Sequence, residues 1–173
     1  MRQQLVVSGL GGQGVLFLTR VIAESALRRG AAVLTAETHG MAQRGGSVLS
    51  TIKIGAFRSP LIARGTADVG LFLAAENLPV HGPLLRPTGA LLVVTNEPGA
   101  WRAVDAAAVA RELGAPVLAN LVLLGAAVAD DLLCVGRIDV EATIHAISPP
   151  KLVEANLEAF HRGLGLVPVR SEA

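Results

Sequence analysis

The sequence contains little cysteine, few aromatic residues and no large surplus of either charge. Cys134 is the only cysteine among 173 residues, which excludes an internal disulfide framework and cannot by itself hold an iron–sulfur cluster or a structural zinc ion. Any redox cluster therefore belongs to another chain. The formal net charge of +1 is too small to indicate nucleic acid or an anionic membrane as a partner.

Long apolar runs are also missing. No stretch reaches the roughly 18 uninterrupted apolar residues that a membrane span needs. The segment from Leu5 to Leu18, preceded by Arg2, superficially resembles a secretory signal, but four glycines and Gln13 interrupt it. We therefore interpret it as strand, turn and helix, and expect a cytoplasmic chain. A length of 173 residues suits one compact domain, expected over residues 1–165 with a loose tail at 166–173.

The first 37 residues follow a strand–turn–helix–strand pattern. Gln4–Ser8 is a short apolar run, and residues 15–29 repeat apolar positions at helical spacing before Gly30. Ala32–Ala36 is then a second strand, so we expect a βαβ unit with a right-handed crossover. Ser47–Ile54 alternates like a further strand, with a hairpin return predicted at Phe57–Ile62.

The remaining sequence predicts more strands and helices. Continuous apolar runs indicate central parallel strands, and capping residues mark helix starts. We expect a single doubly wound, mainly parallel sheet with helices on both faces and a β-hairpin insertion after the second strand. The predicted strands are 69–74, 91–95 and 116–118; the predicted helices are an irregular 76–85, one capped by Asp105 and ending at Gly114, a buried 119–133, 140–147 capped by Asp139, and 151–162 closed by Gly163.

The first motif is the glycine-rich turn between the first strand and the first helix. Gly9, Gly11 and Gly14 fit the pattern G-x-G-x-x-G in its required context. Such glycines let backbone N–H groups approach a phosphate at a helix N-terminus. Glu37 lies about 20 residues beyond, where a ribose-binding acid would sit. An NAD-binding module is therefore one interpretation, and a turn that only permits a tight crossover is another.

The second motif is the polar loop that follows the second strand. His39, Gln43 and Arg44 place a titratable ring, an amide and a fixed cation among several glycines. Arg44 could bind a carboxylate or a phosphate with two hydrogen bonds. The same loop could dock a partner or simply complete the surface of the domain.

Together the two motifs resemble a known family. The stretches are 9–15 (GLGGQGV), 39–48 (HGMAQRGGSV), 59–62 (SPLI), 67–69 (ADV) and 150–160 (PKLVEANLEAF) with Gly163. They are similar to the gamma-type subunit of 2-oxoacid:ferredoxin oxidoreductases, and the form HGMAQRGG is most similar to the beta subunit of the indolepyruvate-type enzymes. The resemblance extends over nearly the whole chain.

This resemblance implies an oxidoreductase subunit that is inactive alone. A larger partner would carry thiamine diphosphate, Mg and iron–sulfur clusters, and would oxidatively decarboxylate an aryl 2-oxoacid to an acyl-CoA while reducing ferredoxin. This chain would bind none of these cofactors by itself and would share coenzyme A or the 2-oxoacid carboxylate with the partner. The implied substrate-binding, CoA-binding or interface residues are Gly11, Gly12, Gln13, Gly14, His39, Met41, Gln43, Arg44, Gly45 and Gly46.

Two other hypotheses remain at this stage: a stand-alone NAD-binding Rossmann module, and a structural scaffold that completes a partner's fold. The nearly all-apolar segment 119–133 indicates a helix buried in the chain or covered by a partner. It also makes a homo-oligomer of the isolated chain plausible. His81, His145 and His161 are expected to have structural roles.

Overall fold

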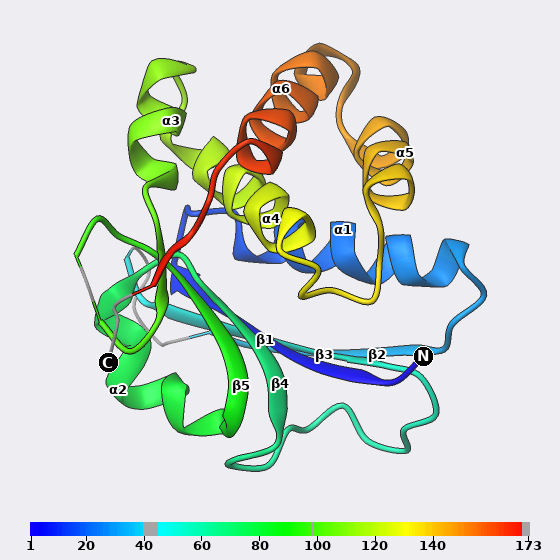
Figure 1. The fold of residues 1–173 in the computed structure, drawn as a ribbon. Coiled ribbons are helices and arrows are strands. Elements are labelled where there is room, and N and C mark those ends of the chain that lie inside the picture. The colour runs from blue at the N-terminus through cyan, green and yellow to red at the C-terminus, as the bar shows by residue number, and fades with distance from the viewer. Residues whose placement is uncertain (40–44, 98, 171–173) are drawn as a thin grey trace.

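A computed structural model gives the fold of the chain and describes residues 1–39, 45–97 and 99–170 (Figure 1). Within these residues a sheet of seven strands has the order β2-β3-β1-β4-β5-β6-β7. β1, β4, β5 and β6 are parallel, β3 is antiparallel to both β1 and β2, and β7 is antiparallel to β6. The strands are β1 (Gln3–Leu10), β2 (Val33–His39), β3 (Ser47–Ile54), β4 (Ala67–Phe72), β5 (Leu85–Val94), β6 (Arg102–Val104) and β7 (Val169–Arg170).

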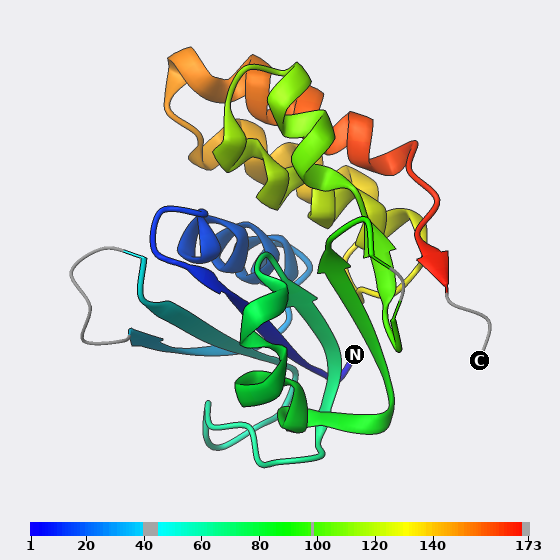
Figure 2. The same cartoon turned by 90° about the vertical axis from the view of Figure 1, so that its left-hand side faces the viewer.

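Most of the helical residues cover one face of this sheet. α1 (Val15–Arg28) and α4 (Ala119–Ala129) lie nearest the strands, while α5 (Arg137–Ile147) packs on α1 and α6 (Val153–Leu164) on α4 (Figure 2). α3 (Ala106–Glu112) lies beside α4. α4 is apolar on every side because it lies between the sheet and α6, so the predicted buried helix is covered by this chain itself.

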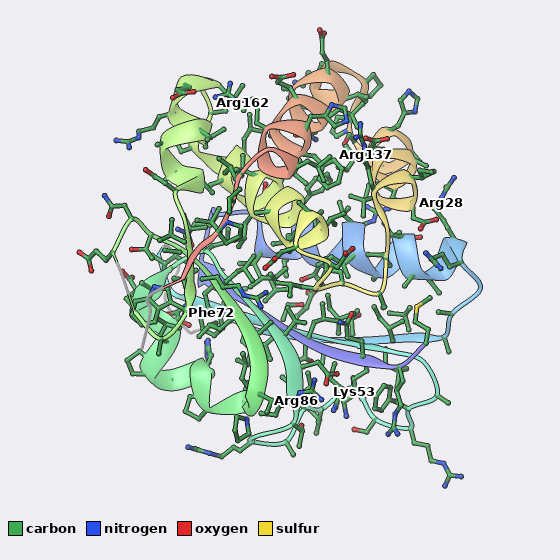
Figure 3. All side chains as sticks on the ribbon, in the orientation of Figure 1. Arg28, Lys53, Phe72, Arg86, Arg137 and Arg162 are labelled. Atoms are coloured by element: carbon green, nitrogen blue, oxygen red, sulfur yellow. The ribbon has the colours of Figure 1, made fainter. Side chains whose placement is uncertain are left out.

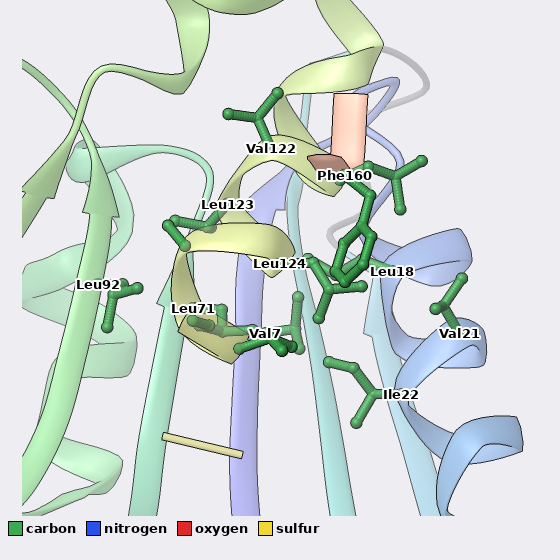
Figure 4. Close-up of a cluster of buried hydrophobic side chains, with 14 of the residues drawn as sticks. Val7, Leu18, Val21, Ile22, Leu71, Leu92, Val122, Leu123, Leu124 and Phe160 are labelled. Atoms are coloured by element: carbon green, nitrogen blue, oxygen red, sulfur yellow. The ribbon is translucent and has the colours of Figure 1, made fainter. Parts of the chain in front are cut away.

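The main core forms between α1, α4, α6 and the sheet. Leu18, Leu124 and Phe160 meet above the strands, and Val7 and Leu71 project toward them from β1 and β4 (Figure 4). All five side chains are fully buried. Burial of each such side chain contributes roughly 1.5–3 kcal/mol, so this face supplies most of the apolar stabilisation.

The opposite face carries a smaller core. Its buried members are Val6, Ala67, Phe72 and Val93. The short helix α2 (Leu78–His81), the 3-10 turns η1 (Ala75–Asn77) and η2 (Gly82–Leu84), and the segment after β3 cover it. Figure 3 shows Phe72 inside the molecule and the labelled arginines of α1, α5 and α6 on the outside. Helices therefore lie on both faces, but very unequally.

Several predicted elements differ from the structure. The sheet is mixed rather than mainly parallel, because three of its six neighbouring strand pairs are antiparallel. The hairpin is formed by β2 and β3, whereas the predicted return at 57–62 forms no strand. That segment instead covers the sheet, with Thr51 Oγ1 donating to the Pro60 carbonyl at 3.1 Å.

The hairpin also changes the predicted βαβ unit. β3 lies between β1 and β2 and pairs with both, so the first two strands are parallel but not neighbours. The predicted strand at 116–118 is the 3-10 turn η3 (Pro116–Leu118). Part of the segment expected to be a loose tail is hydrogen-bonded, because β7 pairs with β6.

The observed helix boundaries confirm some of the predicted helix caps and ends and contradict others. The Asp105 side chain accepts from Ala108 N and caps α3, as predicted. Asp139 is three residues inside α5, where it accepts from the N–H of Gly136 at 3.4 Å. Gly163 does not close the last helix but lies within α6, packed against Gly125 of α4. No helix in the described part of the chain combines the length and apolar character needed to cross a membrane.

Candidate functional site

The glycine turn connects β1 to α1 at the carboxyl edge of the sheet. Gly12 and Gly14 have φ values of 93° and 76°, a left-handed conformation that other residues adopt only with strain. Among the described residues the N–H groups of Gly12 and Gly14 find no hydrogen-bond acceptor. The turn therefore presents backbone donors beside the N-terminus of a helix of 14 residues, an arrangement that favours an anion or a carbonyl oxygen.

Gln13 closes the turn from inside. Its Oε1 accepts from Leu10 N at 2.7 Å, and its Nε2 donates to the Leu73 carbonyl at 3.3 Å. Its own backbone N–H donates to the Leu10 carbonyl at 3.1 Å. Because each end of the amide makes a hydrogen bond within the protein, Gln13 shapes the turn and ties β1 to the end of β4.

Two further carboxamides hold the turn from opposite faces of the sheet. Asn77 Nδ2 donates to the Gly9 carbonyl at 2.8 Å from the α2 side. Asn120 Nδ2, at the start of α4, donates to the Gly14 carbonyl at 3.1 Å. Both asparagines are buried. A Cβ atom on Gly14 would overlap the Asn120 side chain, so this glycine is required for space as well as for backbone angle.

Asn77 also belongs to a small polar cluster under the end of β1. Asn77 Nδ2 lies 3.0 Å from Ser8 Oγ, which in turn lies 2.7 Å from His81 Nδ1. Burial lowers the pKa of His81, because it disfavours the charged form of the ring. Because Ser8 is fully buried, this serine–histidine pair fixes the strand end and cannot attack a substrate.

The structure brings part of the second motif against the first. Gly11 N donates to the Gly46 carbonyl at 2.9 Å, and a Cβ on Gly11 would lie 3.6 Å from Gly45 N. The backbone of His39 is in register with Val48 of β3, which pairs with Gly9 of β1. His39 is thus two strand spacings, about 9.5 Å, from β1. Three motif residues, Met41, Gln43 and Arg44, lie outside the described residues.

The position of Glu37 weighs against the dinucleotide interpretation. In that interpretation the acid at the end of the second strand lies one strand from the glycine turn. Here β3 separates the two strands, and Glu37 pairs with Ser50, which pairs with Val7. The backbone of Glu37 therefore lies one strand farther from the glycine turn than that interpretation requires. It is level with Val7, three residues before the end of β1.

A groove runs along the carboxyl ends of β1, β4 and β5. It consists of three adjoining cavities of about 350, 300 and 430 Å³. The first two share Gly12 and Val117, and the last two share Ala107 and Pro116. We call it the carboxyl-edge groove. Helices leave β1 and β4 toward opposite faces of the sheet, which makes this a switch point where open α/β proteins bind ligands.

Sequence reasoning missed the residues that complete this site. Asn77, Asn120, Pro116 and Val117 belong to segments far from the glycine turn in sequence, and no motif spacing connects them with it. The two asparagines offered one weak signal, since each interrupts or begins an otherwise apolar helical segment. A polar residue at such a position is expected to have a buried hydrogen-bond partner.

Fold and site define an open α/β protein whose glycine turn faces a groove at the switch point of a mixed sheet. Comparison with known proteins then identifies the family. The chain belongs to the Pyruvate ferredoxin/flavodoxin oxidoreductase family, whose pattern matches residues 4–166. It is 33% identical to the Indolepyruvate oxidoreductase subunit IorB of Archaeoglobus fulgidus, over 94% of each chain.

Two solved structures share the fold. The gamma subunit of a keto/oxoacid ferredoxin oxidoreductase from Geobacter sulfurreducens aligns with a TM-score of 0.74 at 28% identity, covering 93% of this chain and 95% of that one. Pyruvate oxidoreductase subunit PORC from Thermotoga maritima aligns with a TM-score of 0.76 at 26% identity, covering 94% of each. The predicted resemblance to gamma-type subunits is confirmed.

Proposed function

We propose that this chain is the non-cluster subunit of a cytoplasmic 2-oxoacid:ferredoxin oxidoreductase that acts on indolepyruvate or another aryl pyruvate. The domain at 1–165 would carry this role. The similarity to an indolepyruvate oxidoreductase subunit over nearly the full length of both chains supports the substrate class. Thiamine diphosphate with Mg and the iron–sulfur clusters are assigned to a larger partner subunit, because one cysteine cannot supply the thiolates of a cluster.

The proposed reaction has a simple balance. The 2-oxoacid loses its carboxyl group as CO₂, its acyl carbon gives up an electron pair to ferredoxin, and coenzyme A takes the acyl group as its thiol releases a proton. The partner's cofactors would supply this chemistry when bound. This chain would contribute one wall of the site, where the donors of Gly12 and Gly14 can bind a carbonyl or carboxylate oxygen.

The observation that carries the proposal is the contact between the two glycine motifs. Gly11 is hydrogen-bonded to Gly46, so the turn and the start of β3 form one continuous rim that leads into the carboxyl-edge groove. Leu16 and Val117 are apolar, and 40% and 45% exposed on the wall of this groove. Such an exposed rim suits contact with a second subunit.

Recovery of the partner tests the proposal. The tagged chain, purified from extract of its own cells, should bring down a larger subunit that contains thiamine diphosphate and iron–sulfur clusters. The recovered complex should reduce ferredoxin with indolepyruvate and coenzyme A, whereas neither subunit alone should do so. Recovery of the chain only with itself, or a complex that oxidises no 2-oxoacid, would contradict it.

NAD binding provides the control for the alternative function. On the proposed function NAD titrated into the isolated chain gives no saturable binding, since Glu37 is separated from the turn by β3. Saturable NAD binding that is lost in Glu37→Ala would instead support a dinucleotide-binding module.

A further inference from the structure

The strand β2 forms one margin of the sheet and pairs on one side only. Its seven residues are in register with β3 from one end to the other, without a bulge. It contains no proline and no lysine, and its one carboxylate is Glu37. Proline, lysine, bulges and short length are the features that usually keep an edge strand from pairing with another chain. The opposite margin, β7, is protected by its length of two residues, whereas β2 is not protected in any of these ways.

The backbone of β2 shows which groups point outward. Gly55 N donates to the Ala32 carbonyl at 2.7 Å, and these two residues continue the register in which Val33 is opposite Ile54. In antiparallel strands, residues that are hydrogen-bonded to the partner alternate with residues whose N–H and C=O groups point away from it. Val33 and Thr35 therefore direct these groups away from β3. Within the described part of the chain their N–H groups meet no acceptor.

A second copy of the same strand fits this edge in an antiparallel register. A two-fold axis through Thr35 places this residue opposite Thr35 of the second copy, as a pair that exchanges two backbone hydrogen bonds. Leu34 then lies opposite Ala36 of the second copy, and both side chains are half-buried on the same face of β2. Paired threonines and apolar contacts between neighbouring strands are favourable.

The position of Glu37 favours this two-fold arrangement over a parallel one. In the antiparallel register Glu37 is level with Val33 of the second copy. The two Glu37 residues are then four positions apart along the strands, about 14 Å. Parallel pairing in register would place the two carboxylates side by side, which is unfavourable.

We propose that two copies of this chain associate through β2, paired antiparallel about Thr35. The two seven-stranded sheets then form one continuous sheet. The homo-oligomer uses a strand edge and not α4, which α6 covers within each copy. This inference goes beyond the proposed function and does not depend on it, because it involves neither the 2-oxoacid nor the larger subunit.

Thr35→Pro tests the edge in the full-length chain. Proline removes the outward N–H of residue 35 but no hydrogen bond to β3, so an edge strand tolerates it. In sedimentation equilibrium the unaltered chain should have a mass near twice 17.8 kDa. Thr35→Pro should raise the dissociation constant of this dimer at least about tenfold, because both central hydrogen bonds are lost. Thr35→Ser is the control and should dimerise normally. Circular dichroism and thermal melting verify that each variant is folded.

Disulfide cross-linking tests the register separately. In a Cys134→Ser background, Thr35→Cys places two thiols on opposed residues whose Cα atoms are about 5.5 Å apart, which is within the range that a disulfide spans. Mild oxidation should therefore give a covalent dimer on a non-reducing gel. Thr38→Cys is the matched control, since Thr38 is also an exposed threonine of β2, but its two copies would be about 20 Å apart along the strands.

The outcomes distinguish this inference from the proposed function. A chain that sediments as a monomer overturns the inference, and so does a dimer that Thr35→Pro leaves unchanged. Cross-linking by Thr38→Cys but not by Thr35→Cys overturns the register. If the unaltered chain is a monomer and Thr35→Pro prevents recovery of the larger subunit, β2 pairs with that subunit instead. None of these results decides whether the recovered complex oxidises a 2-oxoacid, which tests the proposed function alone.

Discussion

The two faces of the sheet are covered in different ways, yet both reach the same glycine turn. On one face α1, α4, α5 and α6 enclose a large apolar core. On the other, α2 and two 3-10 turns cover four buried apolar residues and the polar cluster of Ser8, Asn77 and His81. The apolar face supplies most of the stability, whereas the hydrogen bonds of the polar face hold the end of β1 in place. Asn120 and Asn77 hold the turn from the two sides.

The largest effect is expected from a substitution in the apolar face, at the point where α4 and α6 cross. A Cβ atom on Gly163 would overlap the Val122 carbonyl, so the backbones must separate. Gly163→Ala should lower the free energy of unfolding by roughly 3 kcal/mol or more, although glycine to alanine inside a helix ordinarily stabilises. Urea unfolding measures this. Gly82→Ala is the control, because open space surrounds Gly82, and a stabilised Gly163→Ala variant would refute the close crossing.

A smaller loss of stability is expected when either of the two asparagines that hold the turn is replaced, and the two losses can be compared. Asn77→Ala removes the amide hydrogen bonds to the Gly9 carbonyl and to Ser8 Oγ, and should lower the free energy of unfolding by about 2 kcal/mol. Asn120→Ala should cost about 1 kcal/mol, since the Gly14 carbonyl still accepts from Leu18 N at 3.0 Å. Chemical denaturation gives both values. The reverse order would mean that the helix face, and not the α2 face, fixes the turn.

The smallest effect is a pH dependence confined to the polar face. Burial lowers the pKa of His81 in the folded state, so the unfolded chain binds a proton more readily. His81 therefore stabilises the fold fully above its ordinary pKa of about 6.5, and this contribution is lost as the pH falls through the lower folded value. Unfolding free energies measured from pH 7.5 down to 5 should decline more steeply in the unaltered chain than in His81→Asn. Equal slopes would remove His81 from the explanation.

Much of the fold could be predicted from local patterns. Helical spacing located α1, and the continuous apolar character of 119–133 indicated the buried α4. The cap at Asp105 and the strand at Ser47–Ile54 were also correct. These features depend on backbone propensity and on the periodicity of burial, which a single sequence contains.

The candidate site could be predicted only in part. Both glycine motifs were identified, and the contact between Gly11 and Gly46 joins them. The role of Gln13 was not foreseen, because a glutamine in a turn has the same sequence signal whether it faces a ligand or closes the turn. The groove residues on α3 and η3 carried no signal, since their proximity to the turn depends on how α4 packs.

The sequence by itself determined the strand–turn–helix unit, the glycines that a left-handed turn requires, and the apolar α4. Only the tertiary structure decided that β3 lies between β1 and β2, that Glu37 is thereby separated from the turn, and that Asn77 and Asn120 meet it from opposite faces. The physical reason is that backbone conformation follows from local sterics and periodicity. The order of strands and the partners of buried amides depend instead on contacts between residues far apart in the chain.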